Sequence, residues 1–352
     1  MNALGQRIAT LIETQGPLSV AQFMTIALLD PSDGYYARRD PFGARGDFIT
    51  APEVSQIFGE LVGLWCVQAW IDQDEPKRAQ LVELGPGRGT LMADALRAAR
   101  LAPEFLTSID VVMVEASDAL RALQQERLRD CGAPVQWKDR FEAGDRPLFL
   151  IANEFFDALP VRQFVHTERG WCERMIVADK GVLGFALSPL ASAVAVEDDA
   201  PIGGVYETSP AALAIAEEIG HAIARKGGAA LIIDYGYDRP GFGETLQAVG
   251  RHRFKDVLDA PGEIDLSAHV DFTALAAAAR RGGAQTFGPV GQGRLLDALG
   301  IGARAEKLAR LNKNEASLVA GAVDRLASPE QMGTLFKALA ILPPHTPTPP
   351  GF

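Results

Sequence analysis

The sequence predicts an α/β protein built on a mainly parallel sheet, and three observations lead to this prediction. Between residues 80 and 152, short apolar runs alternate with segments of helical apolar spacing, as in a parallel sheet with helices between its strands. Three glycines at alternate positions, Gly85, Gly87 and Gly89, directly follow one of these runs, and a helical pattern begins after them. The length of 352 residues suits one large α/β domain with additions.

The first addition, residues 1–77, is expected to be an N-terminal section of helices and loops. Leu4, Ile8 and Ile12 have the spacing of an amphipathic helix. Residues 30–36 and 40–47 are rich in Pro, Gly and Asp and predict turns. The stretch Thr50-Ala-Pro-Glu53 has capping-box spacing with proline in the first turn, and it predicts a long helix over residues 51–71.

Residues 78–160 are expected to form the first part of the sheet. The apolar runs predict strands at 80–84, 110–115, 134–137 and 148–152. The segments 91–100 and 118–129 have helical spacing. Strand and helix thus alternate through this part of the chain.

Residues 161–226 break the alternation. Short runs separated by Gly170 and Gly181 predict an antiparallel β insertion, and a helix is expected at 210–226. Residues 227–342 then complete the sheet with strands at 229–234, 284–287 and 334–341, interrupted by a late helical insertion at 294–326. The proline-rich tail, residues 343–352, is expected to fray.

Composition excludes several classes of function. The 45 acidic and 34 basic residues give a net charge of −11, which argues against binding to nucleic acid or to anionic membranes. No run of eighteen apolar residues predicts a membrane span. The three cysteines are scattered and the five histidines lack metal-ligand spacing, so neither a disulfide framework nor a metal site is expected. The N-terminus lacks the apolar core of a signal peptide, and we expect a cytoplasmic protein of undetermined oligomeric state.

The glycine loop is typical of a cofactor-binding turn. Its glycines can adopt positive φ and let a ligand approach without a Cβ in the way, and the N-terminus of the following helix faces that ligand. The dinucleotide fingerprint requires a glycine where this chain has Thr90, and a P-loop requires a Gly-Lys-Ser/Thr ending that is missing. Neither common nucleotide interpretation fits well.

Glu115 is a second candidate for cofactor binding. It ends the apolar run 109–114, about 26 residues after Gly89. A carboxylate at the end of that strand can accept hydrogen bonds from the vicinal ribose hydroxyls of an adenosine cofactor. The alternative is that Glu115 only caps the helix expected after Ser117.

A third cluster, Asn153, Glu154 and Asp157, follows the strand at 148–152. Ligands of open α/β sheets bind beyond the carboxyl ends of the strands, which makes this cluster a candidate substrate site. Carboxylates there could orient a guanidinium group. The alternative is that Asn153 and Glu154 only cap a following helix.

The motifs resemble a known family. Glu83-x-Gly-x-Gly-x-Gly89 after a strand resembles motif I of the class I S-adenosylmethionine (SAM) methyltransferases, which have a Rossmann-like fold. Segments 46–60, 82–91 and 153–160 occur in the order found in the MidA-type family, the bacterial relatives of the mitochondrial complex I assembly methyltransferase. The similarity continues through segments 234–236, 265–272, 288–293 and 332–337, so it covers nearly the whole chain.

This resemblance implies a SAM-dependent enzyme that symmetrically dimethylates an arginine ω-nitrogen on a peripheral-arm subunit of complex I and supports assembly of that complex. It implies catalytic roles for Glu154, Asn153 and Asp157. The implied cofactor-binding residues are Glu83, Gly85, Gly87 and Gly89 around the methionyl group, Glu115 at the ribose, Asp139 near the adenine, and Gly46, Asp47 and Thr50 covering the cofactor or shaping the acceptor channel.

Two alternatives remain open on the sequence. The first is an NAD-dependent oxidoreductase, which the fold permits and the glycine spacing opposes. The second is an assembly chaperone that keeps a SAM-binding fold without catalysis. The better-known arginine methyltransferases carry a pair of glutamates on one hairpin, whereas this chain has Glu154 and the shorter Asp157. Their mechanism therefore cannot be transferred unchanged.

Overall fold

A computed structural model of the chain describes residues 2–38, 49–194, 200–239, 241–250 and 253–352. The chain divides into two units. The large unit comprises Ile49–Phe156, Leu213–Asp238 and Val270–Phe352, and the small unit comprises Met1–Phe48, Asp157–Ala212 and Arg239–His269.

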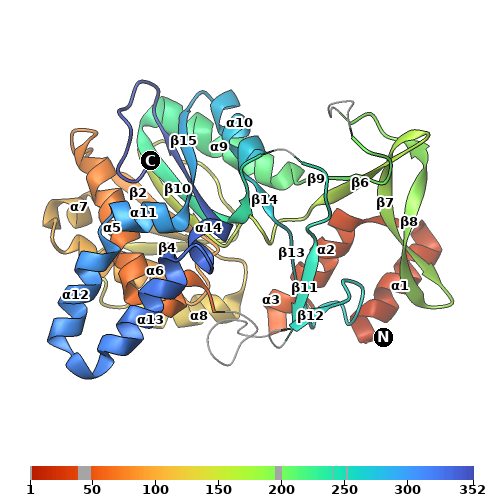
Figure 1. The fold of residues 1–352 in the computed structure, drawn as a ribbon, viewed down its shortest axis with the longest axis horizontal. Coiled ribbons are helices and arrows are strands. Elements are labelled where there is room, and N and C mark those ends of the chain that lie inside the picture. The colour runs from red at the N-terminus through yellow and green to blue at the C-terminus, as the bar shows by residue number, and fades with distance from the viewer. Residues whose placement is uncertain (1, 39–48, 195–199, 240, 251–252) are drawn as a thin grey trace. The chain divides into compact units, whose positions relative to one another are not determined.

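The large unit is built on an eight-stranded sheet (Figure 1). Its main order is β15 (Gln285–Gly291), β16 (Phe336–Leu342), β10 (Gly228–Tyr237), β5 (Leu148–Asn153), β2 (Ala79–Leu84), β3 (Ile109–Val114) and β4 (Val135–Lys138), and β14 (Val270–Asp271) pairs with β10. β16 runs antiparallel to both of its neighbours, whereas the other pairs are parallel. This arrangement confirms the predicted class I methyltransferase fold.

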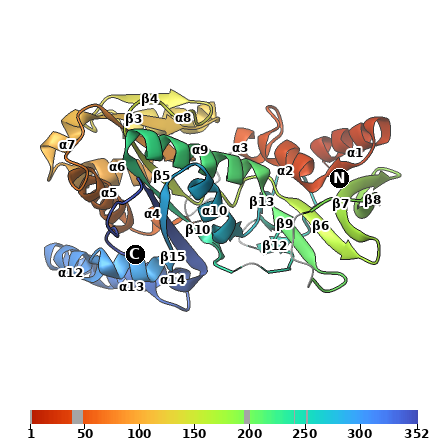
Figure 2. The same cartoon turned by 90° about the horizontal axis from the view of Figure 1, so that it is seen from above.

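Helices cover this sheet. Residues 154–161, which follow β5, contain no helix. The helices are α4 (Ala51–Val54), α5 (Gln56–Ile71), α6 (Thr90–Ala99), α7 (Pro103–Ser108), α8 (Asp118–Arg127), α10 (Phe272–Arg281), α11 (Gln292–Ala298), α12 (Ile301–Leu311), a 3-10 turn at Lys313–Glu315, α13 (Ala316–Ala327) and α14 (Met332–Leu335). Leu81, Val111 and Phe149 of the sheet share one hydrophobic cluster with Phe58 and Trp65 of α5. The helix α9 (Pro210–Lys226) leads into β10 with the predicted bounds. Figure 2 shows α12 and α13, the late helical insertion, packed side by side.

The long helix predicted over residues 51–71 is wrong in one respect, because it is broken at Ser55. Ser55 has an extended backbone, with φ −159° and ψ 139°. Its hydroxyl oxygen accepts the backbone N–H of Ile57 and so caps α5 separately from α4. A serine hydroxyl offers the backbone this alternative to a helical hydrogen bond, which explains the break.

The C-terminal tail packs against the large unit, so the expectation that it frays is wrong. The indole N–H of Trp65 donates to the carbonyl of Pro350 at 3.2 Å. Gly351 lies against Leu295, and Phe352 packs on the same hydrophobic cluster. Proline content alone predicted a loose end, whereas contacts with distant residues hold it.

The small unit combines three helices with antiparallel strands. Its helices are α1 (Ala3–Gln15), α2 (Val20–Leu29) and α3 (Tyr35–Arg38). Its main sheet has the order β1 (Leu18–Ser19), β7 (Gly170–Asp179), β6 (Arg162–Thr167) and β9 (Val205–Thr208), with β8 (Val182–Ala191) paired to β7 (Figure 1). A smaller sheet has the order β12 (Arg253–Lys255), β11 (Gln247–Gly250) and β13 (Asp265–Ser267). The antiparallel insertion is therefore confirmed.

Candidate functional site

The register of the large sheet brings three predicted site residues to neighbouring positions. β2 pairs with β3 on one side and with β5 on the other, so the strand order reverses there. The last residue of β2 is paired with Val114 and Ala152. Gly85, Glu115 and Asn153 follow these positions along one edge of the sheet. Ligands of open α/β sheets bind at such a reversal.

The glycine loop has the backbone that its sequence predicts. Gly85, Gly87 and Gly89 have φ values of 59°, 52° and 74°, a region that side chains with a Cβ avoid. A Cβ at Gly85 would lie 2.9 Å from the ring of Phe155, in the segment after β5. Gly89 is the N-cap of α6, so the first-turn N–H groups of that helix, which have no partner within the helix itself, lie next to the loop.

Two buried acceptor atoms at this edge have no hydrogen-bond partner among the described residues. They are Glu83 Oε2, in β2, and Asn153 Oδ1, in β5. Burial raises the pKa of Glu83 well above its ordinary value, and the hydrogen bond from the Met92 amide only partly opposes this. A cationic ligand with N–H donors would satisfy such acceptors. The ammonium group of SAM, the cofactor that the resemblance implies, fits this requirement.

Glu115 is bonded to the helix that follows it. Its Oε1 accepts the backbone N–H of Ser117 at 2.8 Å, and its Oε2 accepts the Gln124 amide at 3.3 Å. Burial raises the pKa of Glu115, and the hydrogen bonds from Ser117 and Gln124 oppose that rise. Ser117 and not Glu115 is the N-cap of α8, because the Ser117 hydroxyl accepts the N–H of Leu120. Glu115 contacts that N-cap residue and Gln124, and its ribose role stays a prediction. Gln124 was not recognised from the sequence.

Asp139 follows β4 along the same edge of the sheet. Its side chain is 84% exposed and forms an ion pair with Arg121. The Arg121 guanidinium also donates to the Glu115 carbonyl, with Nε at 2.7 Å. Asp139 is therefore linked to the Glu115 segment, and its contact with adenine stays a prediction.

Glu154 lies directly after β5 in an unusual backbone conformation. Its φ is 49°, in the left-handed region that few residues with side chains adopt. Its Oε1 accepts the N–H of Ala51, the first residue of α4, at 2.9 Å and the Asn153 amide at 3.1 Å. The alternative, that it caps a following helix, is wrong, because Glu154 caps α4, about a hundred residues earlier. Strained backbone of this kind is concentrated at functional sites.

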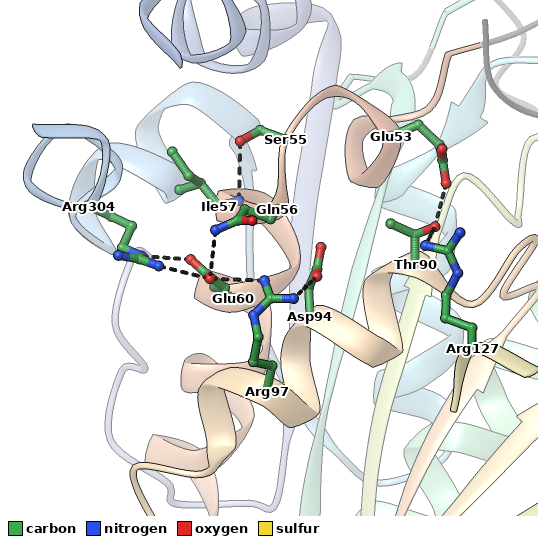
Figure 3. Close-up of polar contacts among 10 residues, drawn as sticks. All are labelled: Glu53, Ser55, Gln56, Ile57, Glu60, Thr90, Asp94, Arg97, Arg127 and Arg304. Carbon is green, nitrogen blue, oxygen red and sulfur yellow. Dashed lines mark hydrogen bonds and ion pairs between the residues drawn. The ribbon is translucent and has the colours of Figure 1, made fainter. Parts of the chain in front are cut away.

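The short helix α4 has a second anchor at the glycine loop. The hydroxyl of Thr90 donates to Glu53, and Arg127 donates to that hydroxyl at 2.8 Å (Figure 3). Arg88 Nη1 lies 3.9 Å from the Glu53 carboxylate. Thr90 occupies the position where a dinucleotide-binding loop has glycine. The hydrogen bond from its hydroxyl to Glu53 explains why this chain has threonine there. Sequence reasoning gave Glu53 only a capping role and missed this contact.

The remaining residues of the N-terminal section are partly outside the described residues. Gly46 and Asp47 lie there, so their expected roles stay predictions. Thr50 is the N-cap residue of α4, as its sequence predicts, but its own side chain makes no capping hydrogen bond. Glu154 supplies the acceptor instead.

Asp157 belongs to the small unit, where two further motifs meet. Its carbonyl accepts the N–H of Ala268 at 2.9 Å. The hydroxyl of Tyr36 donates to Asp265 at 3.2 Å. Burial raises the pKa of Tyr36 well above its ordinary value, and the charges of Asp265 and Asp157 add to the rise. The turn at 30–36 and the segment 265–272 thus meet near Asp157, a residue of the expected substrate site.

Asp234, which ends the buried part of β10, has a structural role in the segment after β5. It is fully buried, and its Oδ2 accepts the N–H of Phe156 at 3.0 Å. Its Oδ1 accepts the N–H of Tyr235 at 2.9 Å. These bonds hold the chain that carries Glu154.

Neither a metal site nor a membrane-spanning helix is found in the described parts of the chain. No group of three or more His, Cys, Asp or Glu side chains there could hold a metal ion. No helix in those parts has the length and apolar character that crossing a membrane requires.

Comparison with known proteins identifies the cofactor of this chain. Residues 61–290 match the family described as S-adenosyl-L-methionine-dependent methyltransferase. The chain is 38% identical to protein arginine methyltransferase NDUFAF7 of Danio rerio, over 96% of this chain and 86% of that protein. It is 39% identical to the Homo sapiens protein of the same name, over 94% of this chain and 81% of that protein.

A crystal structure from Burkholderia thailandensis bound to S-adenosyl-homocysteine (SAH) has the same fold, with a TM-score of 0.86 and 31% identity over 99% of this chain and 94% of that one. These findings decide between SAM and NAD in favour of SAM, which the glycine loop and the two unpaired acceptors also fit. The chain therefore belongs to the SAM-dependent methyltransferase family that includes the NDUFAF7 proteins.

Proposed function

We propose that this methyltransferase modifies an arginine side chain of a protein. The observation that carries the proposal is the position of Asn153, the last residue of β5, and of Glu154, which follows it, next to Gly85 of the cofactor loop. A carboxylate and an amide oxygen there suit a guanidinium group, which offers five N–H donors and no acceptor. The relatives named protein arginine methyltransferase, at 38–39% identity over most of the chain, support the same acceptor.

The chemistry requires a group that orients the guanidinium and balances its positive charge. In the transfer, a guanidinium nitrogen forms a bond to the methyl carbon as the carbon–sulfur bond breaks. The electron pair of the broken bond stays on sulfur, which leaves as the thioether of SAH, and the nitrogen loses its proton to solvent. Glu154 would hold the fork by charge-assisted hydrogen bonds and stabilise the charge on the other nitrogens. Its hydrogen bonds to Ala51 and Asn153 fix its orientation before the substrate arrives.

The family resemblance extends the proposal to a specific acceptor. It implies symmetric dimethylation of a peripheral-arm subunit of complex I, in support of complex I assembly. The net charge of −11 favours approach of a basic, arginine-bearing segment. As part of this proposal, the reaction takes place in the cytoplasm.

The test is a mass-spectrometric comparison of arginine methylation in host cells with and without the gene. One dimethylarginine, on the complex I subunit, should disappear without the gene and return with the wild-type protein. Gly87→Val, in the cofactor loop, should not restore it, whereas the exposed Glu306→Gln variant should. Persistence of the mark in the deletion strain would refute this acceptor. If Gly87→Val restores complex I assembly without the mark, the non-catalytic chaperone is the better description.

A further inference from the structure

Gln124 is a buried polar residue of α8. α8 contributes Leu120 and Gln124 to the interior, one helical turn apart, and Gln124 is 0% exposed. Leu128, a further turn on, is buried as well. Gln124 therefore stands at a position of the α8 face that an apolar residue would ordinarily occupy. A buried amide at such a position needs partners for its donors and its acceptor.

The partners of Gln124 come from three different elements. Its Nε2 donates to the carbonyl of Gly87 in the glycine loop at 2.7 Å. The same nitrogen donates to Oε2 of Glu115, after β3, at 3.3 Å. Its Oε1 accepts the indole N–H of Trp137, in β4, at 2.8 Å. Figure 2 shows α8 close to β3 and β4. One amide group thus joins the two segments expected to bind opposite ends of SAM.

The glycine loop is also shaped around this side chain. A Cβ at Gly89 would lie 3.3 Å from Cγ of Gln124, closer than most Cβ contacts in proteins. A larger residue at Gly89 would therefore press on Gln124 in addition to straining the positive φ of 74°. The hydrogen bond to Gly87 and the packing at Gly89 both depend on the position of Gln124.

We propose that Gln124 is a positioning residue that sets the distance between the Glu115 carboxylate and the glycine loop. The inference rests on the proposed assignment of Glu115 to the cofactor ribose. Gln124 itself need not touch the cofactor. It orients the Glu115 carboxylate toward the ribose hydroxyls and holds the Gly87 carbonyl, so that both ends of SAM meet groups at a fixed spacing.

The amide is suited to this task because its two N–H groups can serve a carboxylate and a carbonyl at once. A glutamate at position 124 would present only acceptor atoms to the Gly87 carbonyl and the Glu115 carboxylate, which are themselves acceptors. When ionised, it would also repel Glu115. A methionine has similar length and no donors. The structural alternative is that Gln124 only supports β4 through Trp137, in which case Glu115 would keep its orientation without it.

The experiment combines a protein variant with a ligand variant. The affinities of SAH and of its 2′-deoxy analogue are measured by calorimetry for the wild type, Gln124→Met and Glu115→Gln. Gln163→Met is the matched control, because Gln163 is also 0% exposed, lies in β6 of the small unit and has its own side-chain partner, Glu207, at 2.6 Å. Each variant is first shown to be folded by circular dichroism.

We expect removal of the 2′-hydroxyl to weaken binding about tenfold in the wild type and in Gln163→Met, since a hydrogen bond to a charged group is lost. That penalty should shrink in Glu115→Gln, whose amide keeps one acceptor oxygen but no charge, and should shrink to about twofold or less in Gln124→Met. A purely structural role of Gln124 would leave the tenfold penalty intact and would overturn the inference. A full penalty in Glu115→Gln would instead refute the ribose assignment on which it rests. Loss of the penalty in Gln163→Met would also overturn it, because the effect would then not be specific to Gln124.

Discussion

Glu60 provides a quantitative test of how α6, the helix after the glycine loop, is held in place. Its side chain, on α5, is 6% exposed and lies among arginines from two other helices (Figure 3). Arg304 of α12 donates to both of its oxygens at 2.7 and 2.9 Å, and Arg97 of α6 donates at 3.0 Å. The network therefore ties the late insertion and the helix after the glycine loop to α5. Glu60→Gln keeps the shape of the side chain and removes its charge.

The size of the effect follows from these contacts. A hydrogen bond between charged groups is worth about 1.5–3 kcal/mol, and Glu60 accepts three from arginines. Solvent screens the arginine side, because Arg304 is 28% exposed and Arg97 44% exposed. Glutamine also retains one acceptor oxygen. We therefore expect Glu60→Gln to lower the free energy of unfolding by about 2–3 kcal/mol.

The assay is urea denaturation of the variant beside the same substitution at an exposed ion pair. Glu306 of α12 pairs with Arg310 at 3.2 Å, and both side chains are exposed. Glu306→Gln should cost at most about 0.5 kcal/mol. If the two variants are equally stable at neutral pH, the buried network contributes no more than a surface pair, and the reasoning fails.

The pH dependence of this difference has a defined sign. Burial alone would raise the pKa of Glu60, but the hydrogen bonds from Arg304 and Arg97 outweigh it and the pKa falls below its ordinary value of 4.5. The stability contributed by Glu60 should therefore be complete above pH 4.5 and be lost as the pH falls through its lower folded value. The wild type and Glu60→Gln should thus converge in acid and not in base.

Three further predictions concern the site. Gly87→Val should abolish SAH binding in calorimetry, because φ at Gly87 is 52°; Gly203→Val, at a φ of 87° with open space around it, should bind normally, and equal binding by both variants would remove Gly87 from the site. Glu154→Gln should keep SAH affinity while single-turnover transfer to the identified arginine falls about 10²–10³-fold, and a wild-type rate would contradict its catalytic role. The affinity for SAH should fall as the pH is lowered, and the fall should begin at a higher pH than protonation of an ordinary glutamate would give. Burial raises the pKa of Glu115, and its protonation removes an acceptor. A constant affinity between pH 7 and 4 would contradict the ribose contact.

Much of the fold was predictable because it depends on local patterns. The helix at Pro210–Lys226 and the strand at Leu148–Asn153 follow from apolar periodicity, and their bounds agree with the prediction within one residue. The packing of the tail was not predictable in this way. Its hydrogen bond to Trp65 joins residues 285 positions apart. No periodicity within the tail encodes such a contact.

The site was predictable where it lies at strand ends, and less so elsewhere. Glu115 and Asn153 could be found because the topology of a parallel sheet gathers the residues that follow its strands. Gln124 and Glu53 lie within helices, and each has a hydrogen-bond partner 37 positions away. The only local signal for Gln124 was a polar residue one turn from Leu120 on a buried face. Such a signal does not identify a partner.

The double role of Glu154 determines which substitution can reveal its chemistry. Its Oε1 caps α4 through Ala51, and α4 in turn contacts the glycine loop through Glu53 and Thr90. Glu154→Ala would remove the cap as well as the charge, and loss of a helix cap costs about 0.5–2 kcal/mol. A loss of turnover in that variant could then arise from a displaced glycine loop. Glutamine keeps the acceptor for Ala51, so a turnover defect with unchanged SAH affinity would be due to the charge of the carboxylate.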